Sequence, residues 1–157
     1  MILHHITNEN GVEDTHWYVD LQISASKVVR NMLIDTGASI STLGIKTVAR
    51  LYEQNESDII KYIKNSGVHD RLVKNTATND RIELYGIYVR NVKLGDVSMP
   101  VLKAYTRLDG YISNLIGMDV ISACKLDLNY GKQGNADMVL SFYNPDVSGS
   151  AEIKALK

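Results

Sequence analysis

The sequence has one cysteine, almost no net charge and no long apolar run. Cys124 is the only cysteine in 157 residues, which excludes an intrachain disulfide and a thiolate metal cluster. Seventeen lysines and arginines against 18 aspartates and glutamates leave a formal charge of -1, so the chain has no electrostatic footprint for nucleic acid or an anionic membrane. No stretch approaches about 18 consecutive apolar residues, and no basic segment followed by an apolar run opens the chain. We expect a soluble, cytoplasmic protein with no nucleic-acid or membrane partner.

Signatures of metal, phosphate and nucleophile sites are also missing. The histidines show no ligand spacing, and the adjacent His4 and His5 would point to opposite faces of a strand. No glycine-rich phosphate loop follows an apolar strand, and no His-Ser-Asp signature is present. Cys124 lies in an apolar segment and is expected to be a small buried side chain. We therefore predict no metal site and no cofactor.

Length and patterning indicate one all-β domain over residues 1–157. The chain is 45% hydrophobic and 22% charged, and its length allows one sizeable core but not two. From His16 to Ser24 every second residue is apolar, and the pattern resumes from Val28 to Ile34 after a turn at Ala25–Lys27. Further alternating runs lie at Ile82–Leu94, Met99–Ala104, Lys125–Tyr130 and Met138–Tyr143.

Helices are expected only in short segments. Ile45–Tyr52 and Ser57–Asn65 have helical spacing, with Ser57 as the candidate N-cap of the second helix and Gly67 just past its end. A further short helix begins at Asp119, where a carboxylate can accept hydrogen bonds from free backbone donors. We assign Asp119 a structural role.

Two motifs carry the chemical signal of the sequence. The first is Met32–Leu43, MLIDTGASISTL, in which an apolar strand runs into Asp35 and a turn of small residues. A carboxylate at the end of a buried strand is costly to bury, which points to chemistry. The second is Leu115–Ile121, LIGMDVI, with two apolar residues on each side of Gly-x-Asp.

Together the two motifs resemble those of the retropepsin-like aspartic proteases, the single-domain family that includes retroviral proteases and their cellular and bacterial relatives. In that family the first motif carries the catalytic Asp in a turn, and the second forms the crossing strand and helix start that brace it. The resemblance implies that Asp35 is catalytic and that Gly117 is the bracing glycine. The residues of the active-site turn would be Thr36, Gly37, Ala38 and Ser39. In order of elements the resemblance extends roughly from Trp17 to Tyr143.

The resemblance implies an aspartic endopeptidase, a peptide hydrolase on a closed, barrel-like retropepsin fold with short helices. Two carboxylates that share a proton can activate water and protonate the substrate carbonyl. Because the chain supplies one such Asp, the second must come from another copy in an isologous homodimer. In that dimer Thr36 would lock the two turns together and Gly37 would permit close approach of the backbones. The substrate would be an extended polypeptide.

The resemblance also assigns two further segments. The polar tip at Thr76, Ala77, Thr78 and Asn79 occupies the place of the flap that closes over substrate, although an ordinary exposed hairpin fits the same pattern. Residues 55–68 form a helical insertion relative to the family, or a surface helix that packs an apolar stripe. For the whole chain, the alternatives to an endopeptidase are a non-catalytic dimerising or peptide-binding module on the same scaffold and a protease active only within a larger assembly.

Overall fold

The computed structural model describes residues 3–7, 9–12, 15–66, 70–75, 77–130 and 136–142, and this part of the chain is mostly β-sheet with a few short helices. The predicted all-β class is thus confirmed. In chain order the elements are β1 (Tyr18–Ser24), β2 (Lys27–Ile34), α1 (Ile45–Leu51), α2 (Glu56–Ser66), β3 (Arg71–Asn75), β4 (Arg81–Leu94), β5 (Val97–Arg107), β6 (Leu115–Ile116), α3 (Met118–Ile121), β7 (Cys124–Tyr130) and β8 (Ala136–Phe142).

The hairpin of β1 and β2 follows from the alternating pattern of its sequence. The two strands pair antiparallel from Tyr18 opposite Leu33 to Ser24 opposite Lys27. Val19 and Leu21 are fully buried, whereas Gln22 between Leu21 and the next apolar residue is exposed. The predicted hairpin is confirmed, and it carries the chain to Asp35 at the end of β2.

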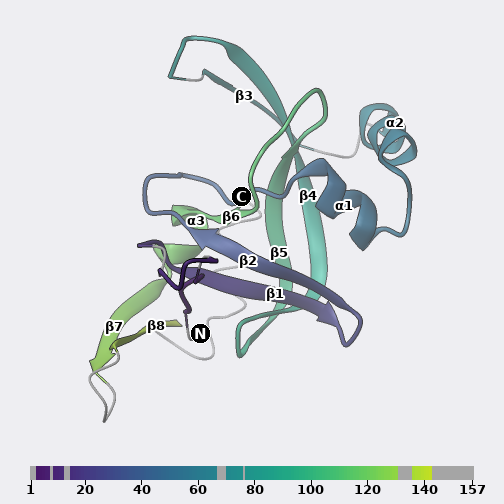
Figure 1. Cartoon of the computed structure of the whole chain (residues 1–157). Helices are drawn as coiled ribbons and strands as arrows, with labels where there is room; N and C mark the ends of the chain where they lie inside the picture. Colours follow the sequence, from purple (N-terminus) through teal and green to yellow (C-terminus); the bar gives the residue numbers. More distant parts are fainter. Residues whose placement is uncertain are drawn as a thin grey trace.

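A long hairpin of β4 and β5 forms the other half of the sheet. The strands pair antiparallel from Leu84 opposite Arg107 to Leu94 opposite Val97. Gly95 has a φ of 62° in the connecting turn, a conformation that glycine adopts without steric cost. The first half of β4 also pairs with β3, and its last residues pair with β1. The hairpin of β3 and β4 extends away from the β1–β2 pair (Figure 1).

The main sheet is open, so the predicted closed, barrel-like retropepsin fold is wrong. The strand order is β3-β4-β1-β2-β6, with β5 pairing along β4, and β7 and β8 form a separate two-stranded sheet. Between β5 and β6 the described chain makes only isolated bridges, from Thr42 to Tyr105 and from Thr42 to Leu115. The ladder cannot continue past them, because the chain turns into α1 at Ile45.

The two predicted helices are confirmed as α1 and α2, which lie next to each other beside the sheet (Figure 1). Ile59 and Ile63 of α2 are buried in the core cluster. The N-cap, however, is Asn55 and not Ser57, because the Asn55 Oδ1 atom accepts the Asp58 N–H at 2.8 Å. Of the predicted insertion, residues 55–66 are described and 67–68, including the expected C-terminal glycine, lie outside the described residues.

The core is formed by side chains of the main sheet and of α1, α2 and α3. Met32, Leu43, Ile87 and Ile116 are fully buried in it. Cys124 is buried at its edge, and desolvation raises the pKa of its thiol to about 11. The thiol therefore stays protonated near neutral pH, as expected of a buried apolar contact. None of the helices in the described part of the chain has the length and apolarity needed to cross a membrane.

Candidate active site

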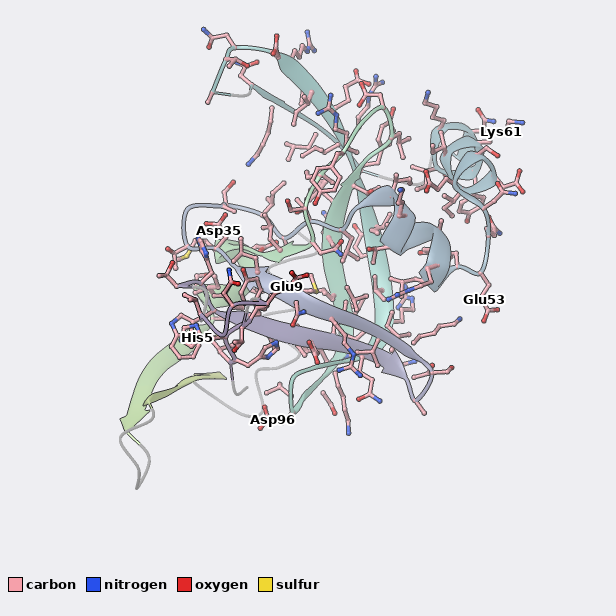
Figure 2. The ribbon with its side chains drawn as sticks, viewed as in Figure 1. His5, Glu9, Asp35, Glu53, Lys61 and Asp96 are labelled. Atoms are coloured by element: carbon pink, nitrogen blue, oxygen red, sulfur yellow. The ribbon has the colours of Figure 1, made fainter. Side chains whose placement is uncertain are left out.

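Asp35 lies where the chain leaves the sheet at the end of β2 (Figure 2). The last two residues of β2 pair in parallel with β6, Leu33 with Leu115 and Ile34 with Ile116. The Asp35 N–H continues this pairing by donating to the Ile116 carbonyl at 2.9 Å. The backbone of Asp35 is therefore held by the sheet, while its carboxylate projects beyond it.

The turn after Asp35 fixes one oxygen of the carboxylate. The Gly37 N–H donates to Asp35 Oδ1 at 2.9 Å, and the Ala38 N–H donates to the Asp35 carbonyl at 3.2 Å. Asp35 is partly exposed and both Thr36 and Gly37 are exposed. The other oxygen, Oδ2, has no hydrogen-bond partner within the described part of the chain. One carboxylate oxygen is thus oriented and the other is available.

The segment after the turn wraps around β6. Before the Asp35 turn, Leu33 pairs with Leu115 on one edge of β6. After the turn, Thr42 and Leu115 exchange two backbone hydrogen bonds of 3.0 Å on the other edge. β6 is therefore hydrogen-bonded on both edges, to the two parts of the chain that flank Asp35.

Gly117 is the point at which the turn and the second motif touch. A Cβ atom at Gly117 would lie 2.9 Å from the Ala38 carbonyl oxygen and 2.6 Å from the Ile40 carbonyl carbon, closer than Cβ atoms approach backbone in proteins. The next residue, Met118, donates its N–H to the Ala38 carbonyl at 2.8 Å. Only glycine allows the backbones of the two motifs to come this close, so the second motif packs directly against the Asp35 turn.

Asp119 and Ser41 join the two motifs by side-chain hydrogen bonds. The Asp119 carboxylate accepts the Ser41 N–H at 2.9 Å and the Ser41 hydroxyl at 2.7 Å, in agreement with its predicted structural role. The same hydroxyl accepts the Gly117 N–H at 3.0 Å. Ser41 is completely buried. The sequence prediction missed Ser41, although a serine within the apolar exit ISTL of the first motif needs partners once it is buried.

Of the predicted flap residues, Ala77, Thr78 and Asn79 lie at the tip of the hairpin of β3 and β4. The strands pair from Arg71 opposite Tyr85 to Asn75 opposite Arg81, which confirms a hairpin at this position. Residues 77–79 are exposed in the connection, and Asn79 has a φ of 61°. Thr76 lies outside the described residues. Closure over a substrate stays a prediction for this hairpin.

A second residue that the sequence prediction missed is Lys74 of β3. Its Nζ atom donates to the Ser39 hydroxyl at 2.6 Å, and so connects the hairpin to the last residue of the Asp35 turn. Lys74 and Leu72 are half-buried, whereas Val73 between them is exposed. The alternation of β3 therefore places Lys74 on the face that meets the turn.

The root of the hairpin is held by an ion pair with a buried lysine. Asp70 Oδ2 accepts from Lys103 Nζ at 2.6 Å and from the Tyr88 hydroxyl at 2.9 Å, and the Gly86 N–H donates to the Asp70 carbonyl at 2.7 Å. Burial alone disfavours the ammonium, but the contacts with Asp70, Tyr105 and Tyr88 outweigh it and raise the pKa of Lys103 above its ordinary range. Lys103 therefore stays charged, and its ion pair with Asp70 fixes the base of the hairpin.

Other candidate sites lie apart from Asp35. No group of three or more His, Cys, Asp or Glu side chains in the described residues could hold a metal ion. The His4 ring hydrogen-bonds Asn31 and the His5 ring hydrogen-bonds the His16 carbonyl. A cavity of about 570 Å³ lies between α1, α2 and the chain before β6, and none of its lining residues belongs to the Asp35 turn.

The comparisons with protein-family models, with curated proteins and with solved structures find no match for this chain. The functional proposal therefore rests on the geometry around Asp35 and on the chemistry of the residues there.

Proposed function

We propose that the protein is an aspartic endopeptidase that works as a homodimer with one Asp35 from each chain. The observation that carries the proposal is the Asp35 turn itself. One carboxylate oxygen is oriented by the Gly37 N–H, the other has no partner among the described residues, and Gly117 supports the turn from beneath. A structural aspartate such as Asp119 has both oxygens occupied by backbone and hydroxyl donors, whereas Asp35 has only one oxygen so occupied within the described part of the chain.

Peptide hydrolysis needs one group to activate water while another protonates the carbonyl oxygen. Two unit charges about 4 Å apart at an effective dielectric constant of about 20 repel by about 4 kcal/mol, which separates the two ionisations of a carboxylate pair by roughly three pKa units. One carboxylate then stays ionised as the base and the other stays protonated as the acid. The reaction needs no metal ion or cofactor.

The second carboxylate comes from the partner copy in this proposal. Each chain offers one Asp35 turn, and Thr36 and Gly37 are exposed on it in the single chain. A two-fold axis through the turns would bury these residues against their own copies in an isologous contact. The Thr36 hydroxyl would then bond to partner backbone, and the absence of a side chain at Gly37 would let the backbones approach.

The elements around the Asp35 turn also leave a place for an extended peptide. β6 is flanked by the segments before and after the Asp35 turn, and the bridges at Thr42 bring β5 next to β6. The hairpin of β3 and β4 rises beside the turn and touches it through Lys74. An extended peptide could lie between them, held by strand pairing.

The test is a digest of a complex peptide library at several pH values, read by mass spectrometry. The wild-type protein should produce new peptide ends that Asp35→Asn protein does not produce. The exposed Asp96, in the turn between β4 and β5, provides the matched control, and Asp96→Asn protein should cleave as the wild type does. Equal cleavage by wild-type and Asp35→Asn protein would refute the proposal. Retention of peptides without cleavage would indicate a peptide-binding module instead.

A further inference from the structure

Among the described residues, Lys74 is a cation without a counter-ion beside the Asp35 turn. Its single hydrogen-bond partner within the described chain is the Ser39 hydroxyl, and no carboxylate there pairs with it. Its neighbour on β3, Arg71, is paired with Glu83, and the buried Lys103 is paired with Asp70. An ammonium group has three donors, so two of those on Lys74 remain after the bond to Ser39.

Burial distinguishes Lys74 from the lysines of the outer surface. Lys61 on α2 also has no counter-ion within the part of the chain that the structure describes, but its side chain is exposed and α2 lies on the far side of the molecule from Asp35 (Figure 2). Lys74 is half-buried, and its Nζ atom is fixed on the turn by a bond of 2.6 Å. A charge held in place and partly shielded from water interacts more strongly with an opposite charge than a freely moving one does.

The separation of Asp35 and Ser39 along the protein chain sets which residues of a bound peptide would lie near Lys74. Ser39 follows Asp35 by four residues, a path of at most about 14 Å even when fully extended. The turn shortens this path, because the Ala38 N–H folds back to the Asp35 carbonyl. An extended peptide rises about 3.4 Å per residue, so a peptide centred on Asp35 brings residues about two to four positions from its centre near Lys74.

We propose that Lys74 is a specificity residue that selects peptides with an acidic side chain two to four residues from the scissile bond, an inference that rests on the proposed peptide-cleaving function. The substrate carboxylate accepts hydrogen bonds from the two remaining Lys74 donors, while the bond to Ser39 keeps the ammonium in place. Because the dimer is isologous, each chain contributes one Lys74, and acidic residues are accepted on either side of the bond.

The test compares matched peptides that differ only by Glu or Gln at these positions. Their cleavage by wild-type protein should favour the Glu members by about fivefold in kcat/KM, as one partly exposed ion pair allows. The preference should weaken as salt is raised, since salt screens exposed charges. In Lys74→Gln protein the ratio of kcat/KM between Glu and Gln peptides should fall towards one. Lys74→Arg protein should keep the preference for Glu, and the control Lys61→Gln should have the same ratio as the wild type.

A binding measurement separates this inference from the proposed function. The same peptide mixture is passed over immobilised Asp35→Asn protein and the retained members are quantified by mass spectrometry. Glu members should be enriched over Gln members, and the enrichment should vanish in the double variant Asp35→Asn, Lys74→Gln. Equal enrichment with and without Lys74, or no retention of either member, would overturn the role of Lys74. Enrichment that depends on Lys74 in a protein whose wild type cleaves nothing would refute the protease alone.

Discussion

At the scale of single residues, Gly117 lets the two motifs pack closely because it has no side chain. In Gly117→Ala protein the new Cβ would press on the Ala38 and Ile40 carbonyls, and backbone cannot move aside as a flexible side chain can. We expect a loss of about 3 kcal/mol in the free energy of unfolding, the upper end of over-packing costs, together with loss of cleavage. Urea unfolding and a peptide-cleavage assay measure both effects.

The matched control is Gly86→Ala, where the nearest atoms to a new Cβ are side-chain carbons of Asp70 and Lys103 at 3.2 and 3.3 Å. These contacts are tight but can relax, so the loss of stability should be clearly smaller than at Gly117. Equal losses at the two glycines would contradict the view that Gly117 is a point of backbone contact.

The residues around Asp35 also show what could be predicted from one sequence. Asp35, Gly117 and Asp119 belong to patterns of apolar residues followed by small or acidic ones, and such local patterns are visible in the chain. The hydrogen-bond partners of Ser41 and Lys74 cannot be predicted from a local pattern, because they lie 78 and 35 residues away. Their roles follow from tertiary contacts that the periodicity of a strand does not encode.

At the scale of elements, the ion pair at the root of the hairpin predicts a dependence of stability on alkaline pH. Because folding raises the pKa of Lys103, its stabilising effect is complete below the ordinary lysine pKa of about 10.5 and is lost as the pH rises above it. Wild-type protein should therefore lose stability above about pH 10 more steeply than Lys103→Met protein.

The measurement is the free energy of unfolding at a series of pH values, with Lys61→Met as the control. Lys61 is exposed on α2, so its removal should leave the steepness of the wild-type curve unchanged. A parallel course for wild-type and Lys103→Met protein would show that the pair with Asp70 does not stabilise the fold in this way.

The hairpin tip gives a second prediction at this scale. Residues 77–79 are exposed, and closing them over a peptide would exclude water from the site. The amides of 77–79 should therefore exchange more slowly with deuterium when a statine-type peptide such as pepstatin is bound. The turn at Gly95 and Asp96, at the other end of β4, serves as the internal reference and should not change. Unaltered exchange at 77–79 in a saturated complex would argue against a flap.

Elements were predicted better than the connections between them. Alternation located β1, β2 and β4, and helical spacing located α1 and α2, because burial of one face imposes these periods. The cap of α2 was misplaced because Asn55 and Ser57 are both good capping residues, and only the observed bond from the Asp58 N–H to Asn55 distinguishes them. The open sheet was not predicted, because whether β5 and β6 join depends on the tertiary contacts of the segment around Thr42, which makes isolated bridges to both strands.

At the scale of the whole molecule, the proposed shared site predicts how mixtures of chains behave. Asp35→Asn protein should fold and dimerise normally, because the amide has nearly the same shape and removes charge repulsion. Under random exchange, equal amounts of wild-type and variant chains leave about a quarter of the dimers with two intact carboxylates. Cleavage per total dimer should fall to about a quarter of the wild-type value.

Cleavage is measured after co-refolding the two proteins at several ratios. A site made by two chains gives a dependence on the square of the wild-type fraction, whereas a site contained in one chain gives a linear one and about half the activity at equal amounts. Chains mixed without refolding, and assayed at once, provide the control for slow exchange. A linear dependence would rule out the dimeric site.

The parallel pairing of β2 with β6 has a consequence for the order in which the chain is made. Residues 33–34 cannot pair with β6 until residues 115–116 have been synthesised, and Ser41 cannot bond to Asp119 until that residue has been synthesised. At about 5–20 residues per second of synthesis, Asp35 leaves the ribosome roughly 4 to 17 s before its support is complete. A chain that ends at Asn114 should therefore lack the near-ultraviolet circular dichroism of the folded protein, and a native signal from it would contradict this. In the proposed protease, a growing chain would therefore have no supported Asp35 turn until β6 and α3 have been made.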